Sequence, residues 1–225
     1  MTEVSASPSA RRTELLEAAY RYALTHGLAE LSLRPLAKAI GSSPRVLLYL
    51  FGSKEGLVRA LLARARSAEL DLLADLDLSP SIGAAADTDR LVPVAERLWT
   101  WLAADEHRAL LQLWLEGYAR SLVEPESPWA GFARQTVQDW LDILATAQPE
   151  HIRHTDDGRA QRTQVLALLR GALIDLLATG DLDRTSAAVR RHLNGPDRPE
   201  AQCNRQAVPP AGVAVPIEHV TVPEL

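Results

Sequence analysis

The sequence holds a single cysteine, Cys203, among 225 residues, which excludes an internal disulfide and any cysteine-rich zinc site. It also lacks an uninterrupted apolar run of about 18 residues, the length that a membrane-spanning helix needs. The first residues, MTEVSASPSARR, are polar and unlike a signal peptide. These absences favour a cytoplasmic protein with no membrane partner.

Aromatic residues make up only 5% of the chain, and long stretches lack the alternation of apolar and polar residues that is typical of strands. Ala and Leu dominate instead, with apolar residues at helical spacing. The length suits one small and one medium domain. We therefore predict an all-α fold of about nine helices.

The segment at 32–54, SLRPLAKAIGSSPRVLLYLFGSK, predicts two short helices joined by a tight turn. Ser32 is a good N-cap for the first helix, and Gly41 supplies the backbone conformation that ends it. Ser43 and Pro44 begin the second helix, because proline is tolerated in a first helical turn. An apolar face would pack this helix on the first through Val46, Leu47 and Phe51. A second helix that projects its N-terminal residues predicts a DNA-binding helix-turn-helix.

The distribution of charge supports a DNA partner. Residues 1–66 carry ten Lys and Arg against five Asp and Glu, a net charge of +5. Since the whole chain carries −5, residues 67–225 carry −10. A basic N-terminal region on an acidic remainder is typical of a small DNA-binding module attached to a domain with another task.

Stretches rich in proline, glycine and polar residues divide the chain into four regions. The predicted regions are a disordered arm at 1–10, a helix-turn-helix DNA-binding domain at 11–52, a helical ligand-binding and dimerisation domain at 53–195, and a Pro-rich tail at 196–225. A helix beginning after Ser53 and running to about 76 would belong to both domains. A linker or mobile loop is expected at 77–89.

Further helices are expected at roughly 11–26, 90–103, 106–118, 128–147, 159–179 and 184–194. The expected N-caps are Asp105, Ser127 with Pro128, and Asp183, while Gly180 is expected to end the long helix at 159–179.

Residues 11–66, from RRTELLEAAYRYALTHG through LSLRPLAKAIGSSPRVLLYLFGSKEGLVRALL, resemble the tetracycline-repressor (TetR) family of bacterial transcriptional regulators. The resemblance implies a three-helix DNA-binding head, a long fourth helix, and an all-helical body that binds an effector and forms a homodimer. Residues 90–195 resemble the family in organisation only. Leu48 and Leu50 depart from the aromatic or histidine residues usual before the final Phe of the motif and cannot donate to a phosphate, whereas Tyr49 still can.

The residues that we predict to contact DNA are Arg34, Ser43, Pro44, Arg45, Tyr49 and Lys54. Arg45 lies where side chains reach base edges, and a guanidinium can bind guanine O6 and N7 together. The alternative for Arg45 is a phosphate contact or a solvated side chain. Ser43 and Tyr49 are expected to hold phosphates, and Lys54 would bind one together with the amides of a helix N-terminus.

All five tryptophans lie between residues 99 and 140. One interpretation is an aromatic effector pocket, since ligand pockets are mainly apolar with a few polar groups. The pocket residues that we predict are Trp101, Trp114, Tyr118, Phe132 and Trp140, with His107, Gln112 and Glu116 as possible polar anchors. The alternative is that these rings simply fill the core.

The helix expected at 159–179 is apolar around most of its circumference in its second half, so two sides of it must be covered. A second subunit would cover one side. The predicted interface residues are Leu168, Leu169, Ala172, Leu176 and Leu193. The alternative is complete burial within a monomer.

These patterns predict a sequence-specific DNA-binding transcriptional regulator. The resemblance implies a repressor, released from a pseudo-palindromic operator by a small apolar or aromatic effector. One alternative is a constitutive regulator whose body only dimerises. An all-helical enzyme is disfavoured, because no Glu has His three residues later and neither a phosphate-binding loop nor a nucleophile turn is present. No cofactor or metal is expected, since His151, His154, Asp156 and Asp157 fall in one polar loop without a matching cluster elsewhere.

Overall fold

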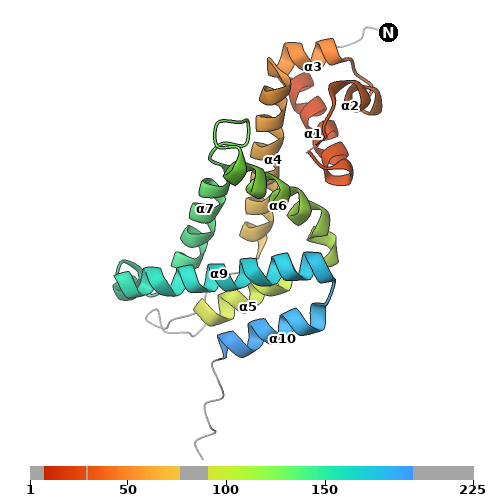
Figure 1. Cartoon of the computed structure of the whole chain (residues 1–225). Coiled ribbons are helices and arrows are strands. Elements are labelled where there is room, and N and C mark those ends of the chain that lie inside the picture. The colour runs from red at the N-terminus through yellow and green to blue at the C-terminus, as the bar shows by residue number, and fades with distance from the viewer. Residues whose placement is uncertain (1–7, 29, 77–90, 195–225) are drawn as a thin grey trace, which may run out of the picture.

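The computed structural model describes residues 8–28, 30–76 and 91–194, and in this part of the chain all regular structure is helical (Figure 1). The helices are α1 (Pro8–His26), α2 (Leu33–Ala39), α3 (Pro44–Phe51), α4 (Lys54–Asp75), α5 (Leu91–Leu102), a 3₁₀ turn (Asp105–His107), α6 (Arg108–Val123), α7 (Phe132–Thr146), α8 (Glu150–Arg153), α9 (Asp156–Thr179) and α10 (Leu182–Leu193). The all-α prediction is confirmed.

Helices α1, α2 and α3 form one end of the molecule, called here the head. Gly27, with φ of +74°, ends α1, and Gly41, with φ of +64°, makes the turn between α2 and α3. Leu36 and Leu47 are fully buried between these helices. The predicted helix-turn-helix is therefore present as α2, a tight turn and α3.

Helix α4 runs from the head into the rest of the helices, called here the body (Figure 1). Its Leu57 and Leu61 are completely buried, and α1, α3 and α6 all pack against it. At the other end of the molecule α9 packs on α5, α7 and α10. One continuous core joins the two regions, so a change of side-chain packing in the body can reach the head through α4 and α6.

The helices of the head begin and end close to where the sequence predicts, with two local differences. Ser43 accepts a hydrogen bond from the Val46 amide at 3.2 Å, and Ser53 accepts one from the Gly56 amide at 3.0 Å. Ser32 occupies the N-cap position of α2, yet its hydroxyl makes no capping bond. Helix α1 begins at Pro8, three residues before the predicted start.

Several predicted boundaries in the body are wrong. Helix α6 begins at Arg108 rather than at a cap from Asp105, which lies in the 3₁₀ turn. Ser127 closes a turn, and α7 begins at Phe132 instead of 128. The Ala133 amide, near the start of α7, donates to the hydroxyl of Ser121 on α6 at 3.1 Å, a contact that no local pattern announces.

The end of the chain differs in a similar way. The loop expected between α7 and α9 contains the short helix α8, and α9 begins at Asp156 with Thr155 as its cap. Asp181, not Asp183, caps α10. Gly180 ends α9 as predicted, with φ of +69°. The loop expected at 77–89 and the tail at 196–225 lie outside the described residues.

Candidate DNA-binding surface and effector cavity

The capped start of α3 fixes which residues it presents outward. Pro44 occupies the first turn behind the Ser43 cap, and Leu47 and Phe51 turn inward to the core. Arg45 and Tyr49, one helical turn apart, are therefore left on the outer side. Tyr49 is 80% exposed, the largest exposure among the large apolar and aromatic residues described. The sequence-predicted base-reading and phosphate-binding residues thus share one accessible face.

Two apolar residues of α3 are exposed as well. Val46, predicted to face the core, is 37% exposed, so its place in the inner face is corrected. Leu48, which departs from the family pattern, is 41% exposed. Exposed aliphatic side chains on a recognition helix can contact thymine methyl groups in a major groove. The sequence analysis noted that Leu48 departs from the family pattern, but interpreted this only as the loss of a phosphate contact.

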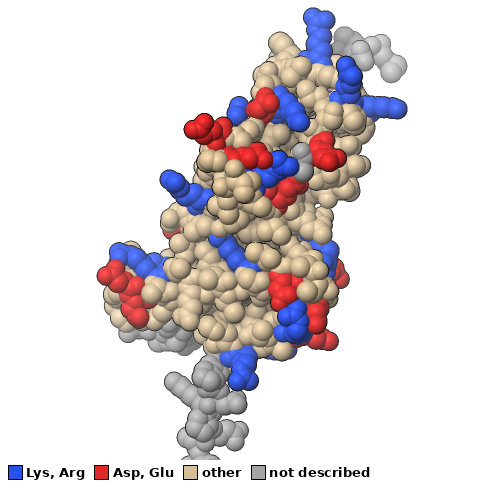
Figure 2. Space-filling view, viewed as in Figure 1, with Lys and Arg blue, Asp and Glu red and all other residues tan. Residues whose placement is uncertain are grey.

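The start of α4 lies against the end of α3. A Cβ added to Gly56 would come within 2.1 Å of the Phe51 carbonyl oxygen, so only glycine permits this approach. Lys54 is exposed at the first position of α4, next to the Ser53 cap, and Arg34 is exposed on α2. Lys and Arg side chains project from the head end of the molecule (Figure 2). A lysine beside helix N-terminal amides is suited to a phosphate.

The predicted effector residues do not all meet. Trp114 on α6 and Trp140 on α7 line a cavity in the body, between α4, α5, α6, α7 and α9. Tyr118 lies beside it, because its ring contacts a side chain of the cavity wall. Trp101 instead stacks on His107, with ring centroids 4.4 Å apart, and Phe132 lines a separate hollow between α4 and α7. Their assignment to the same pocket is wrong.

Two charged residues that the sequence analysis missed line this cavity, Glu69 on α4 and Arg170 on α9. The remaining wall is made by Leu102, Leu111, Leu169 and Leu173. Glu69 is 3% exposed, and its Oε1 accepts a hydrogen bond from Trp140 Nε1 at 2.8 Å. Burial raises the pKa of Glu69 to about 7.

The guanidinium of Arg170 lies over two aromatic rings. Its Cζ is 5.5 Å from the centroid of Trp114 and 5.1 Å from that of Tyr118, and Nη1 donates to the Tyr118 hydroxyl at 3.3 Å. Burial lowers the pKa of Arg170. Arg170 Nη2 and Trp114 Nε1 are both buried and have no hydrogen-bond partner among the described residues. The cavity therefore has unused hydrogen-bond donors as well as apolar walls.

The predicted polar anchors lie elsewhere. His107 Nδ1 is 2.9 Å from the Trp101 carbonyl oxygen, and Gln112 is exposed on α6. Glu116 Oε2 accepts a hydrogen bond from the Leu28 amide at 2.8 Å, 88 positions away in the sequence. This bond joins α6 to the head, where α1 ends. Glu116 thus links the two regions rather than lining the cavity.

Three of the predicted interface leucines are buried in the chain's own core, which corrects that assignment. Leu169 is fully buried and lines the cavity, while Leu176 and Leu193 are 3% and 8% exposed. Leu168 and Ala172 are half-buried. The outer face of α9 consists instead mostly of small residues, with two polar side chains and one large apolar one, namely Ala160, Thr163, Gln164, Ala167, Gly171, Ile174 and Ala178. This face is largely uncharged in Figure 2.

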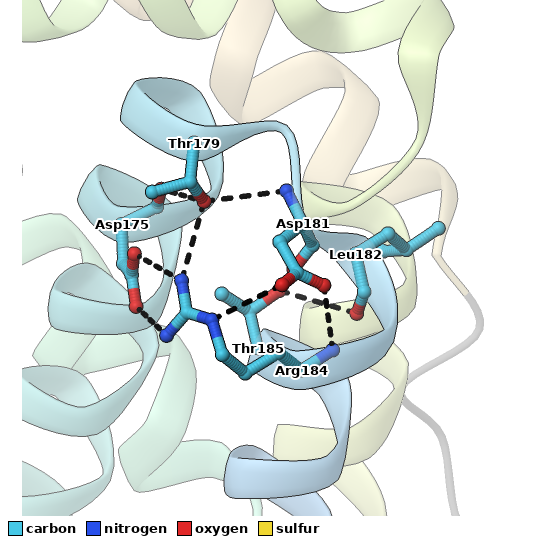
Figure 3. A network of polar contacts seen from close by, with 6 residues as sticks. All are labelled: Asp175, Thr179, Asp181, Leu182, Arg184 and Thr185. Carbon is cyan, nitrogen blue, oxygen red and sulfur yellow. Dashed lines mark hydrogen bonds and ion pairs between the residues drawn. The ribbon is translucent and has the colours of Figure 1, made fainter.

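A polar network fixes the angle between α9 and α10 (Figure 3). Arg184 donates to both carboxylate oxygens of Asp175, at 2.7 and 2.8 Å, and to Asp181 at 3.2 Å. The Arg184 guanidinium lowers the pKa of Asp175, and its own pKa is raised in return. The Asp181 amide donates to the Thr179 hydroxyl at 3.2 Å. The bidentate pair holds the two helices in a defined hairpin.

Among the described residues, none of the helices is long and apolar enough to cross a membrane. In the same ranges, no three His, Cys, Asp or Glu side chains are grouped closely enough to hold a metal ion.

Comparisons with known proteins agree with this architecture. The family profile described as bacterial regulatory proteins of the tetR family matches residues 15–61, from α1 into α4. A search of curated proteins gives no significant match. The fold is similar to that of a TetR-family transcriptional regulator from Rhodococcus sp., with 20% identity over 82% of this chain and 97% of that one and a TM-score of 0.63.

Two further solved structures are similar in fold and contain a ligand. A transcriptional regulator from Saccharomonospora viridis, in complex with choline, is 24% identical over 83% of this chain and 94% of that one, with a TM-score of 0.61. The multidrug binding protein EbrR, complexed with proflavin, is 23% identical over 80% and 98%, with a TM-score of 0.57.

A helix-turn-helix head on an all-helical body defines a class of DNA-binding regulators. The match at residues 15–61 places the head among the DNA-binding regions of the tetR family, and the described helices as a whole share the fold of solved TetR-family regulators.

Proposed function

We propose that the protein is a homodimeric repressor that binds a pseudo-palindromic operator through α3 and is released by a small molecule bound in the body. The observation that carries this proposal is the outer face of α3, where Arg45 and the 80% exposed Tyr49 are both accessible, together with the exposed Lys54 at the start of α4. A base-reading guanidinium flanked by phosphate-binding groups is the arrangement that a major-groove reader needs.

The experiment is a selection from random duplex DNA with the full-length protein. A dimer with two-fold symmetry presents two copies of α3, so the selected sequences should contain an inverted repeat with half-sites about one helical turn, roughly 34–36 Å, apart or a multiple of it. Enrichment of direct repeats or of no sequence would contradict the proposal.

The dimer is proposed to form through the outer face of α9 together with α10. Ile174 is 47% exposed on this face, in the last two turns of α9, and Leu182 at the start of α10 is 46% exposed. The small residues around Ile174 would allow two copies of α9 to approach closely. No side chain needs to leave the core for this contact.

Light scattering tests the dimer directly. The wild-type protein should have about twice the chain mass of 24.6 kDa, and Ile174→Glu should shift it towards the monomer. Leu122→Glu is the matched control, because Leu122 is exposed on α6, away from α9 and α10. Leu169→Glu should instead unfold the protein, because it places a charge in the core. A wild-type mass near 24.6 kDa would contradict the dimer.

The cavity between α4 and α9 is the proposed effector site. Its walls are apolar and aromatic with a few polar groups, as in other ligand sites, and regulators of similar fold have been solved with choline and with proflavin. A constitutive regulator with an unoccupied body is the alternative. It would be favoured if compounds that bind the purified protein never change its affinity for the selected operator.

A further inference from the structure

We propose that the body cavity is a site for an organic cation, and that Arg170 occupies the cation's place until the ligand displaces it. The inference rests on the proposed effector role of this cavity and names its ligand class. The carrying observation is the position of the Arg170 guanidinium, which lies on the faces of Trp114 and Tyr118 with the buried Glu69 in the same cavity wall.

The size of the cavity requires a side chain to move. Its free volume is about 10 Å³, which is room for one water molecule. Seven of the eight lining residues are buried, and Arg170 is the one that is only partly buried. A long flexible arginine can withdraw towards water along its own stem, whereas a buried leucine or tryptophan cannot. We therefore expect the cavity to open for a ligand by withdrawal of the Arg170 side chain.

The space that Arg170 leaves is suited to another positive charge. Ring faces attract cations through their negative quadrupole, and the protein's own guanidinium already uses two of them. Glu69, whose second carboxylate oxygen has no hydrogen bond to a described residue, would lie beside the incoming charge. An anion placed there would instead meet Glu69 after losing Arg170.

The groups around Glu69 set the expected pH dependence. Arg170 acts on it from α9, and Arg66 lies on its own helix and is paired with Asp139 on α7 at 2.5 Å. Tyr20 on α1 interacts with it electrostatically. Since Glu69 has a pKa of about 7, it is partly protonated near neutral pH. Arg170 acts on Glu69 only through its charge, without a hydrogen bond to it, so a cation seated against the carboxylate favours the ionised form more strongly than Arg170 does. Cation binding then releases a proton and strengthens as the pH rises from about 6 to about 8.

Three probes of similar size and different charge test the proposal by calorimetry and tryptophan emission: phenyltrimethylammonium, its neutral isostere tert-butylbenzene, and benzoate. The wild-type protein should bind phenyltrimethylammonium more tightly than either of the others, with affinity that rises with pH. Preference for benzoate or tert-butylbenzene, an affinity that falls with pH, or no binding of phenyltrimethylammonium would overturn the proposal.

Variants locate the site. Arg170→Ala vacates the ring faces and should bind phenyltrimethylammonium about tenfold more tightly, and Arg170→Met is the substitute if the alanine variant loses its helical circular dichroism. Glu69→Gln keeps an acceptor for Trp140 and should weaken binding and remove its pH dependence. Arg159→Ala, exposed on the same helix, should change nothing. Weaker binding by folded Arg170 variants would overturn the displacement of Arg170.

Binding is measured here without DNA, so the result is independent of the operator experiment. Phenyltrimethylammonium that binds as expected but leaves operator affinity unchanged would support the cation site and contradict effector control. Release of the operator by neutral compounds alone, without cation binding, would support effector control and overturn the cation site.

Discussion

Two glutamates on α4 lie in opposite surroundings, one beside the head and one inside the body. Glu55 is fully exposed in the first turn, where its hydrogen bonds to its own backbone amide and to Ser53 lower its pKa. Glu69 is buried fourteen positions later, and burial raises its pKa to about 7. The same side chain is thus favoured as an anion at one place and as a neutral acid at the other.

The difference shows what each region of the molecule can bind. At the head, helix amides and water stabilise negative charge, which is also the requirement for holding a DNA phosphate next to Lys54. In the body, Arg170 lies over aromatic rings and Glu69 is buried, so both charged groups are largely held away from water. The head is therefore suited to a long anionic surface and the body to a small molecule that can be enclosed.

The largest effect that we expect from this comparison is a pH dependence of stability. The Glu69 pKa is raised from 4.5 to about 7, so the folded protein holds this proton more tightly than the unfolded chain does. The contribution of this proton to the free energy of unfolding is fully present below about pH 4.5. It is lost as the pH rises through 7, and the total loss is about 3 kcal/mol.

Urea unfolding at about pH 5 and about pH 8, at one protein concentration, measures this loss. Glu69→Gln should remove most of it, because glutamine does not titrate. Glu55→Gln is the matched control and should leave the loss between these two pH values unchanged, since the lowered pKa of Glu55 acts below this range. Equal pH dependence in wild type and Glu69→Gln would show that Glu69 is not held as a neutral acid.

The second prediction separates two roles at the head. Arg45→Ala should cost about 1–3 kcal/mol at the selected operator and relax specificity at one base position, because a guanidinium contact to a base is lost. Lys54→Ala should weaken all duplexes similarly and reduce the slope of log affinity against log salt by about one unit.

Fluorescence anisotropy with the operator and with random DNA, over a series of salt concentrations, distinguishes the two variants. If Arg45→Ala weakened operator and random duplexes by the same factor, Arg45 would be a phosphate contact, and another exposed residue of α3 would read the bases. Leu48→Ala, at a 41% exposed position, then becomes the next variant to test.

The sequence predicts the head more completely than the body, for a physical reason. Ser43 and Ser53 accept hydrogen bonds from amides three positions later, and Gly41 makes its turn through its own positive φ, so their effects follow from short patterns. The outward position of Arg45 and Tyr49 then follows from helical periodicity. Val46 is the error, because a residue at the edge of the inner face is covered or exposed according to what packs beside it.

The cavity could not be predicted in the same way. Glu69 and Arg170 are 101 positions apart, and each resembles an ordinary charged residue on an amphipathic helix. Which side of α9 is buried depends on the positions of α5, α7 and α10, so Leu169 and Leu176 were assigned to the wrong face. Trp101 and Trp114 were predicted to share a pocket on composition, although only the arrangement of helices decides which rings meet.

The smallest effect that we expect concerns the bond between the two regions. Glu116 on α6 accepts from the Leu28 amide, directly after the turn at Gly27, and its neighbours Trp114 and Tyr118 on α6 lie at the cavity. A ligand that shifts α6 would therefore pull on the end of α1. Glu116→Ala removes the acceptor and leaves a buried amide unpaired, at a cost of about 1 kcal/mol.

Hydrogen exchange of the Leu28 amide measures this cost locally, and Glu116→Gln is the matched control because its amide oxygen can still accept the bond. We expect faster exchange in Glu116→Ala, near wild-type exchange in Glu116→Gln, and unchanged exchange in the centre of α9. Equal exchange in wild type and Glu116→Ala would mean that the bond contributes nothing, and the packing of α1 and α6 on α4 would remain as the route between cavity and head. In Glu116→Ala the ligand should change operator affinity by a smaller factor than in wild type. Because coupling between two sites is reciprocal, the operator should then change ligand affinity by that same smaller factor.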